Sequence, residues 1–178
     1  MRKEIWTLQE HERHAMDEIA ASSDRAAAIV LTAIIDDRVD AVIRKHLHQD
    51  KKVLEKLFHS SGPIGAFSAK IDLGYLLGIY GEDSLKDLHT IRKIRNEFAH
   101  NLAIQKFTES KIRDLTKNLT FPDRFTVRAE TPDGQEVALI ALPKNHGPRR
   151  RFTVTCQMFI MRFDFYMLNE PAIAQPAF

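Results

Sequence analysis

The stretch Ile91-Arg-Lys-Ile-Arg-Asn-Glu-Phe-Ala-His100 lies inside an amphipathic helix pattern. Apolar residues recur there at spacings of three and four, the period of one helix face: Leu85, Leu88, Ile91, Ile94 and Phe98. We expect Asp83 or Ser84 to cap the start of this helix. The pattern predicts a helix that buries one face against the rest of a helical domain.

Further helices are predicted around this stretch. Ser22 or Ser23 is expected to open a long helix over residues 24–48. Residues 64–80 form the next predicted helix, and we expect it to be central because it is apolar on most sides. A helix over residues 108–119 completes this section.

Two local signals add detail. Thr7 and Glu10 have the spacing of a capping box, which predicts a first helix near the N-terminus. Gly74 and Gly78 lie four positions apart, a spacing that would let a neighbouring backbone approach the helix closely.

The region from residue 121 to residue 150 differs in composition. Residues 121–148 hold four of the seven prolines, and Thr131-Pro-Asp-Gly134 is a turn signal between two short β-prone runs. A short β-hairpin is therefore predicted. The three arginines Arg149, Arg150 and Arg151 then lead into a final helix, expected from about residue 152 to residue 169. That helix is apolar almost all round, so it must lie in a core or against another subunit.

The predicted fold class is mainly all-α, a helical bundle with a short β-hairpin insertion around residues 124–142. We expect a single domain over residues 1–178. Its expected parts, in chain order, are a core bundle at 7–120, the hairpin and loop insertion at 121–150, a C-terminal helix at 151–169 and a tail at 170–178.

Composition limits the functional classes. The net charge of +2 gives no general excess for binding polyanions, so any nucleic-acid contact must be local. The single cysteine, Cys156, excludes an intramolecular disulfide. The N-terminus lacks the apolar core of a signal peptide, and the longest apolar run is too short for a bilayer. We therefore expect a cytoplasmic protein without a membrane partner.

The residues with chemical potential are Arg95, Asn96 and His100. A guanidinium binds phosphate as a fixed fork, and a histidine near neutral pKa moves protons. On a helical wheel, Arg95 falls inside the apolar arc and needs a phosphate or a carboxylate, which the Asp36, Asp37 and Asp40 cluster could supply.

Arg92, Asn96 and His100 form a separate row on a more polar flank of the helix. Arg95 and His100 are about 140° apart on a regular helix, so they do not converge within one chain. A shared site would need a bend at the helix end or a dimer axis.

Several motifs occur in the order found in a known family. They are Ser23-Asp-Arg-Ala-Ala-Ala28, Gly62-Pro-Ile-Gly65, Phe67-Ser-Ala-Lys70, Gly74-Tyr-Leu-Leu-Gly78 and the stretch ending at His100. With these motifs, residues 23–100 resemble the mannitol-operon repressor (MltR-like) family. The Arg-Asn-x-x-x-His element is also similar to the signature of HEPN-domain proteins, helical-bundle dimers that include metal-independent ribonucleases. These resemblances imply a bundle of four to six helices and a homodimer with paired motifs.

Two functions remain open at this stage. In the first, the chain is a non-enzymatic regulator of transcription that acts through a protein partner. In the second, it is a metal-independent endoribonuclease of the toxin or antiphage kind, which would make an antitoxin a possible partner. His100 would then take the proton of a ribose 2′-hydroxyl, Arg95 would stabilise charge on phosphorus, and Asn96 would hold the phosphate.

Each of these residues also has a structural alternative. Arg95 could form a buried salt bridge, and His100 could interact with the helix dipole. Arg92 and the three arginines 149–151 are candidate RNA contacts, although such a run is more often a solvated loop end. No metal site or cofactor is predicted, because the pairs His11/His14 and His46/His48 lack a full ligand set. We favour the regulatory function, since the longer resemblance supports it.

Overall fold

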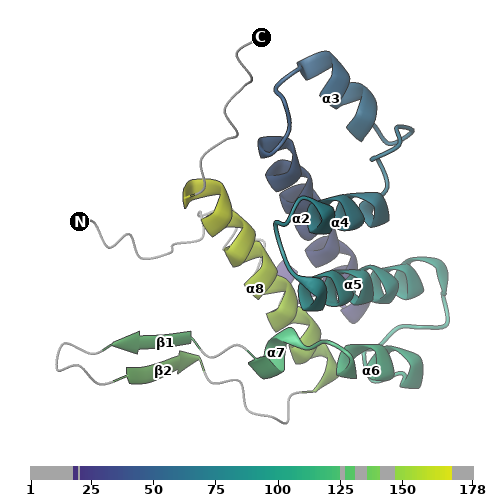
Figure 1. Cartoon of the computed structure of the whole chain (residues 1–178). Coiled ribbons are helices and arrows are strands. Elements are labelled where there is room, and N and C mark those ends of the chain that lie inside the picture. The colour runs from purple at the N-terminus through teal and green to yellow at the C-terminus, as the bar shows by residue number, and fades with distance from the viewer. Residues whose placement is uncertain (1–17, 20, 125–126, 131–135, 141–146, 170–178) are drawn as a thin grey trace.

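The computed structural model describes residues 18–19, 21–124, 127–130, 136–140 and 147–169 (Figure 1). The mainly all-α fold class is confirmed. The predicted helix around Thr7 and the tail at 170–178 lie outside the described residues. The elements run in the order α2 (Asp24–Lys45), α3 (Lys51–Phe58), α4 (Phe67–Leu76), α5 (Glu82–His100), α6 (Ser110–Lys117), α7 (Phe121–Arg124), β1 (Val127–Glu130), β2 (Glu136–Ile140) and α8 (Pro148–Asn169).

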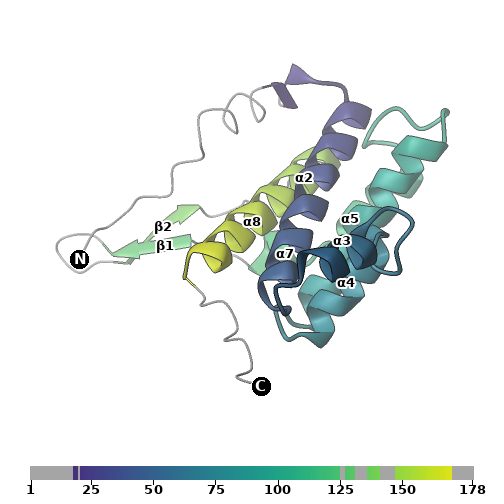
Figure 2. The ribbon, with the colours of Figure 1, turned by 90° about the horizontal axis from the view of Figure 1, so that it is seen from above.

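The central helix of the bundle is α2. It packs against α8, α5 and α4, and Figures 1 and 2 both place it beside α8. Its fully buried apolar side chains follow helical spacing: Ala27, Ala28, Leu31, Ile35, Val39, Val42 and Ile43. Ser23 caps the helix by accepting a hydrogen bond from the backbone N–H of Ala26, as the sequence predicts.

The expectation that residues 64–80 form the central helix is wrong. The helix there, α4, is shorter, and its Leu76 is 79% exposed. It ends because Gly78 adopts a positive φ of 73°. The Gly78 N–H donates to Tyr75 O and the Ile79 N–H to Gly74 O, which is the Schellman arrangement. Gly78 therefore serves to end the helix.

Gly74 also has a local role, different from the one expected. The group that approaches it closely is the ring of Tyr80, and a Cβ atom at position 74 would lie 2.5 Å from the Tyr80 hydroxyl. That hydroxyl donates to Ile71 O at 2.7 Å. The absence of a side chain at Gly74 thus allows the chain to fold back on α4.

Other helix boundaries differ from the prediction. Helix α5 begins at Glu82 with Gly81 as its N-cap, so neither Asp83 nor Ser84 caps it. Helix α8 begins at Pro148, because proline at the first helical position costs no hydrogen bond. The three arginines at 149–151 therefore lie in the first turn of α8. The short helices α3 and α7 were not predicted.

Strands β1 and β2 pair as an antiparallel hairpin, in the region where one was predicted. In both views it projects away from the helices (Figures 1 and 2). The turn between the strands lies outside the described residues. Within the part of the chain described, none of the helices has the length and hydropathy that a bilayer span requires.

Helix α8 packs along α2 and buries its apolar side chains in the molecule's own core. Phe159 and Phe163 are 1% and 5% exposed. A second, exposed set lies toward the end of the same helix: Met161, Phe165 and Leu168. Of the two expected locations for this helix, a core or another subunit, the core therefore holds for most of its length.

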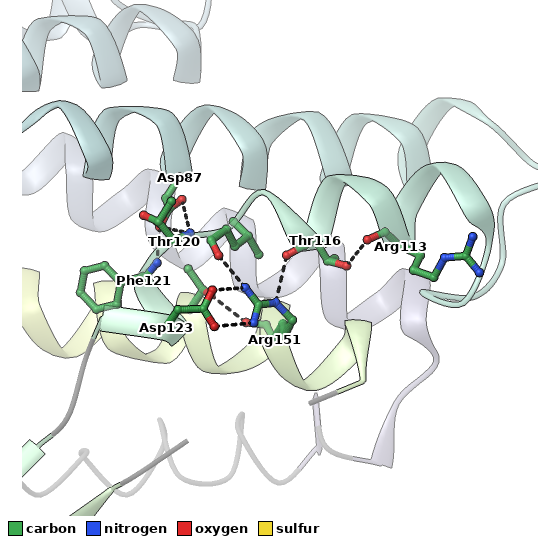
Figure 3. Close-up of polar contacts among 9 residues, drawn as sticks. Asp87, Arg113, Thr116, Thr120, Phe121, Asp123 and Arg151 are labelled. Atoms are coloured by element: carbon green, nitrogen blue, oxygen red, sulfur yellow. Dashed lines mark hydrogen bonds and ion pairs between the residues drawn. The ribbon is translucent and has the colours of Figure 1, made fainter. Parts of the chain in front are cut away.

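Asp87 connects α5 to α7. Its carboxylate is fully buried and accepts hydrogen bonds from the Thr120 N–H, the Thr120 hydroxyl and the Phe121 N–H (Figure 3). Burial raises the pKa of Asp87, and these hydrogen bonds lower it in part. The carboxylate thereby satisfies backbone donors at the start of α7, where helix geometry leaves them free.

We predict that Asp87→Ala lowers the free energy of unfolding by about 2 kcal/mol, because it leaves buried donors without an acceptor. Urea denaturation followed by circular dichroism measures this change. Glu82→Ala on the exposed start of α5 is the control and should leave the midpoint almost unchanged. Equal midpoints for the two variants would show that the Asp87 contacts contribute nothing.

Candidate functional site

A groove of about 320 Å³ lies between α2, the start of α4 and the last turns of α5. It contains three of the residues singled out in the sequence, Arg92, Arg95 and Asn96. Its other lining residues are Ile29, Thr32, Ala33, Asp36, Ala66, Phe67 and Ser68. The groove therefore brings together these three predicted site residues.

The two arginines of the groove are half-buried and differ in their contacts. Arg95 donates from Nη1 to the Oδ1 of Asn96 at 3.1 Å. Arg92 has a buried Nε atom without any hydrogen-bond partner. A buried donor without a partner is uncommon in folded proteins. Neither guanidinium has a carboxylate partner among the described residues.

The acidic cluster of α2 is neutralised by a residue that sequence reasoning missed. Lys70 Nζ lies 2.9 Å from an oxygen of Asp36 and 3.0 Å from one of Asp40. Arg44 also contacts Asp40. Arg95 therefore does not form the salt bridge to α2 that was considered for it. The Phe67-Ser-Ala-Lys70 motif could have indicated this pairing, because its lysine lies on the buried side of α4.

Burial and pairing have opposite effects on this cluster. Burial raises the pKa of Asp36, and the hydrogen bond from Lys70 offsets only part of that rise. Burial alone would lower the pKa of Lys70, but its hydrogen bonds to Asp36 and Asp40 outweigh this and raise it. Lys70 therefore stays charged and holds its two carboxylates close to α4.

His100 lies outside the groove. It is exposed at the last position of α5, whereas Arg92, Arg95 and Asn96 line the groove earlier on the same helix. Within one chain, the proposed proton-transfer residue and the proposed phosphate ligand do not share a cavity. A cationic histidine at this position would interact favourably with the helix dipole.

The three arginines at the start of α8 have different environments. Arg149 donates to Asp24 at 2.7 Å and to the carbonyls of Ile19 and Ser22, both at 2.9 Å. Arg150 is exposed. The first of the three arginines is therefore held by the chain's own acceptors.

Arg151 ties three segments together (Figure 3). It binds both carboxylate oxygens of Asp123 at 2.8 and 2.7 Å, and it donates to the carbonyls of Thr116 and Leu119. The hydrogen bond to Asp123 is the main reason why the pKa of Arg151 is raised. Two of the three arginines thus act as internal ties, and only Arg150 resembles a solvated loop end.

The residues Ser23, Asp24 and Arg25 form a clasp at the start of α2, and the sequence showed only its capping serine. Asp24 accepts the Phe107 N–H at 2.7 Å on one oxygen and Arg149 on the other. Arg25 donates to carbonyls at the end of α5 and just beyond it. These carbonyls belong to Phe98, Asn101, Leu102 and Ile104.

The remaining candidate residues have structural roles. His46 donates from Nδ1 to Val42 O at 2.8 Å, and its Nε2 forms a hydrogen bond with the Tyr166 hydroxyl at 2.6 Å. Cys156 is fully buried, and burial raises the pKa of its thiol. Among the described residues, no three histidine, cysteine or acidic side chains gather as a metal site would require; His11 and His14 lie outside them.

Comparison with known proteins identifies relatives of this fold. A family model described as MtlR, mannitol repressor, matches residues 15–158. The chain is similar to one in the X-ray structure of the MtlR-HPr complex from Escherichia coli, with a TM-score of 0.63 at 18% sequence identity. The match covers 87% of this chain and 99% of that chain. A comparison with curated protein sequences gives no match.

The arginine triplet generates a stability test. We predict that Arg151→Gln, which removes a guanidinium 12% exposed, lowers the free energy of unfolding by about 2 kcal/mol. Arg149→Gln should cost about 1 kcal/mol, because that side chain is 33% exposed and its ion pair is screened by solvent. Arg150→Gln is the matched control and should change stability by less than about 0.5 kcal/mol.

Chemical denaturation of the three variants measures these differences. If Arg150→Gln destabilised the protein as much as Arg151→Gln, the internal contacts would not explain the role of the triplet.

Proposed function

The chain belongs to the mannitol repressor (MtlR) family, and from that premise we propose that it is a regulatory protein acting through contacts with other proteins. The match to this family model confirms the resemblance that was identified from the sequence motifs. In this proposal, the chain controls transcription without a DNA-reading element of its own.

The observation that carries this proposal is the placement of the basic side chains. A helix that reads DNA presents several arginines or lysines to a groove and to the flanking phosphates. In the described part of this chain, Arg25, Arg149 and Arg151 bind the chain's own carbonyls and carboxylates. The net charge of only +2 adds no general excess of positive charge for binding a nucleic acid.

The partner in this proposal is a protein of the HPr kind. The similar Escherichia coli protein was solved as a complex with HPr. The match covers 99% of that Escherichia coli chain, so a surface of its fold has a counterpart in this chain. We infer that HPr, or a comparable protein, binds this chain and adjusts its regulatory activity.

The ribonuclease alternative has no observation in its favour. A metal-independent ribonuclease needs its proton-transfer group and its phosphate ligand at one reacting centre. The groove holds Arg95 and Asn96 but not His100.

We predict that the purified chain binds HPr from its own organism with a micromolar or tighter dissociation constant, measured by isothermal titration calorimetry. A mixed-sequence DNA duplex and a single-stranded RNA serve as comparison ligands under the same conditions. The chain alone should bind neither of them at physiological salt, and it should leave the RNA intact. Specific DNA binding by the chain alone, or cleavage of the RNA, would refute the regulatory proposal as stated.

We also propose a homodimer whose contact is formed by exposed apolar side chains of α8. Phe159 and Phe163 lie on the final helix, which the sequence allowed to pack in a core or against another subunit, and both are buried in the molecule's own core. Met161, Phe165 and Leu168 instead form an exposed i, i+4, i+7 row on α8. A two-fold axis through this row would pair it with itself, as in most homodimers.

Leu168→Asp tests the homodimer. This side chain is 77% exposed, so a charge there should weaken self-association at least tenfold without disturbing the fold. Leu102→Asp, at a leucine 81% exposed beyond α5, is the matched control and should leave association unchanged. Sedimentation equilibrium distinguishes the two. A wild-type monomer at micromolar concentration would rule out the dimer.

A further inference from the structure

The groove between α2, α4 and α5 contains more hydrogen-bond donors than acceptors. Arg92 and Arg95 contribute two guanidinium groups, and one buried nitrogen of Arg92 has no partner. Asn96 accepts the hydrogen bond from Arg95 on its amide oxygen. Its NH₂ group remains as a further donor, because the amide is fixed with its oxygen toward Arg95.

The start of α4 adds donors on the opposite wall. Ala66 is the N-cap of this helix and has no side-chain oxygen to accept its first N–H groups. Ala66, Phe67 and Ser68 all line the groove. The positive end of a ten-residue helix and the Ser68 hydroxyl therefore face the same space as the two arginines.

The carboxylate that lines the groove already has a cationic partner. It belongs to Asp36, and Lys70 binds one of its oxygens at 2.9 Å. Asp36 and Lys70 offset each other, so the two guanidinium groups leave the groove positive. A positive groove of this kind attracts an anion.

We propose that this groove binds a small phosphomonoester, with Arg92 and Arg95 on the phosphate oxygens and the start of α4 opposite them. Guanidinium forks match the geometry of phosphate, and helix N-termini bind it through backbone N–H groups. The volume of about 320 Å³ is at the lower end for small-ligand sites. It accommodates a phosphate with a short organic group.

A nucleic acid fits this groove less well. A strand needs a succession of phosphate contacts along a basic track. The arginines that could extend such a track at the start of α8, Arg149 and Arg151, are bound within the chain. The proposal does not depend on binding of a partner protein, so each can be tested and rejected without the other.

The test uses the full chain with inorganic phosphate and glycerol 3-phosphate as probes, and with glycerol as the uncharged comparison. Thermal unfolding is followed at constant ionic strength, with chloride replacing phosphate in the reference samples. Both phosphate probes should raise the melting temperature, because a ligand that binds only the folded state stabilises it. Glycerol 3-phosphate should act at lower concentration than inorganic phosphate, because the groove is proposed to bind its organic group as well.

Arg92→Gln should weaken the affinity for both probes at least tenfold. Arg113→Gln, at an exposed arginine on α6 outside the groove, is the matched control and should bind as wild type does. Affinities come from calorimetric titration. Equal affinities for Arg92→Gln and wild type would overturn the proposal, as would a wild-type melting temperature that phosphate raises no more than chloride.

Ser68→Asp gives a test that does not depend on removing an arginine. It places a carboxylate in the first turn of α4, among the same donors. Without any ligand, this variant should melt at a higher temperature than wild type, and phosphate should no longer raise that temperature. A variant that still responds to phosphate as wild type does would show that the anion binds elsewhere.

Discussion

The clasp at the start of α2 is the contact on which the arrangement of the helices depends. Three consecutive residues, Ser23, Asp24 and Arg25, cap α2, hold the first turn of α8 through Arg149, and bind the carbonyls that end α5. Because α2 packs against α8, α5 and α4, fixing its first turn also fixes how these helices meet. The groove depends on this, since two of its walls are α2 and α5.

Arginine acts in this protein mainly as a tie for helix ends. The last carbonyls of a helix lack partners and carry a partial negative charge, which a guanidinium fork can satisfy. Arg25 does this at the end of α5, and Arg151 does it at the end of α6 while also binding Asp123. Arginines bonded in this way are not available to bind a nucleic acid. Arg92 and Arg95 differ because no carboxylate among the described residues holds them.

The periodicity of the apolar residues predicted the features that depend on a single helix. The apolar face of α5 was recognisable because Leu88, Ile91 and Phe98 repeat with the helical period, and all three are fully buried. The Ser23 cap and the hairpin region were predictable for the same local reason. The partners that residues contact across the fold were not predictable. Periodicity shows which face of a helix is buried, but it does not show which helix covers that face. The acids of α2 thus pair with Lys70, and the groove depends on where α4 begins, a position set by tertiary packing.

The pairing of α2 with α8 has a consequence for the synthesis of the chain. The ion pair between Asp24 and Arg149 joins residues 125 positions apart, and the largest helix contact in the fold spans the same separation. Until α8 has been translated, the side of α2 that it covers has no native partner. Contacts this distant slow folding, and an uncovered apolar helix invites aggregation. Completion of the bundle must therefore follow translation of α8.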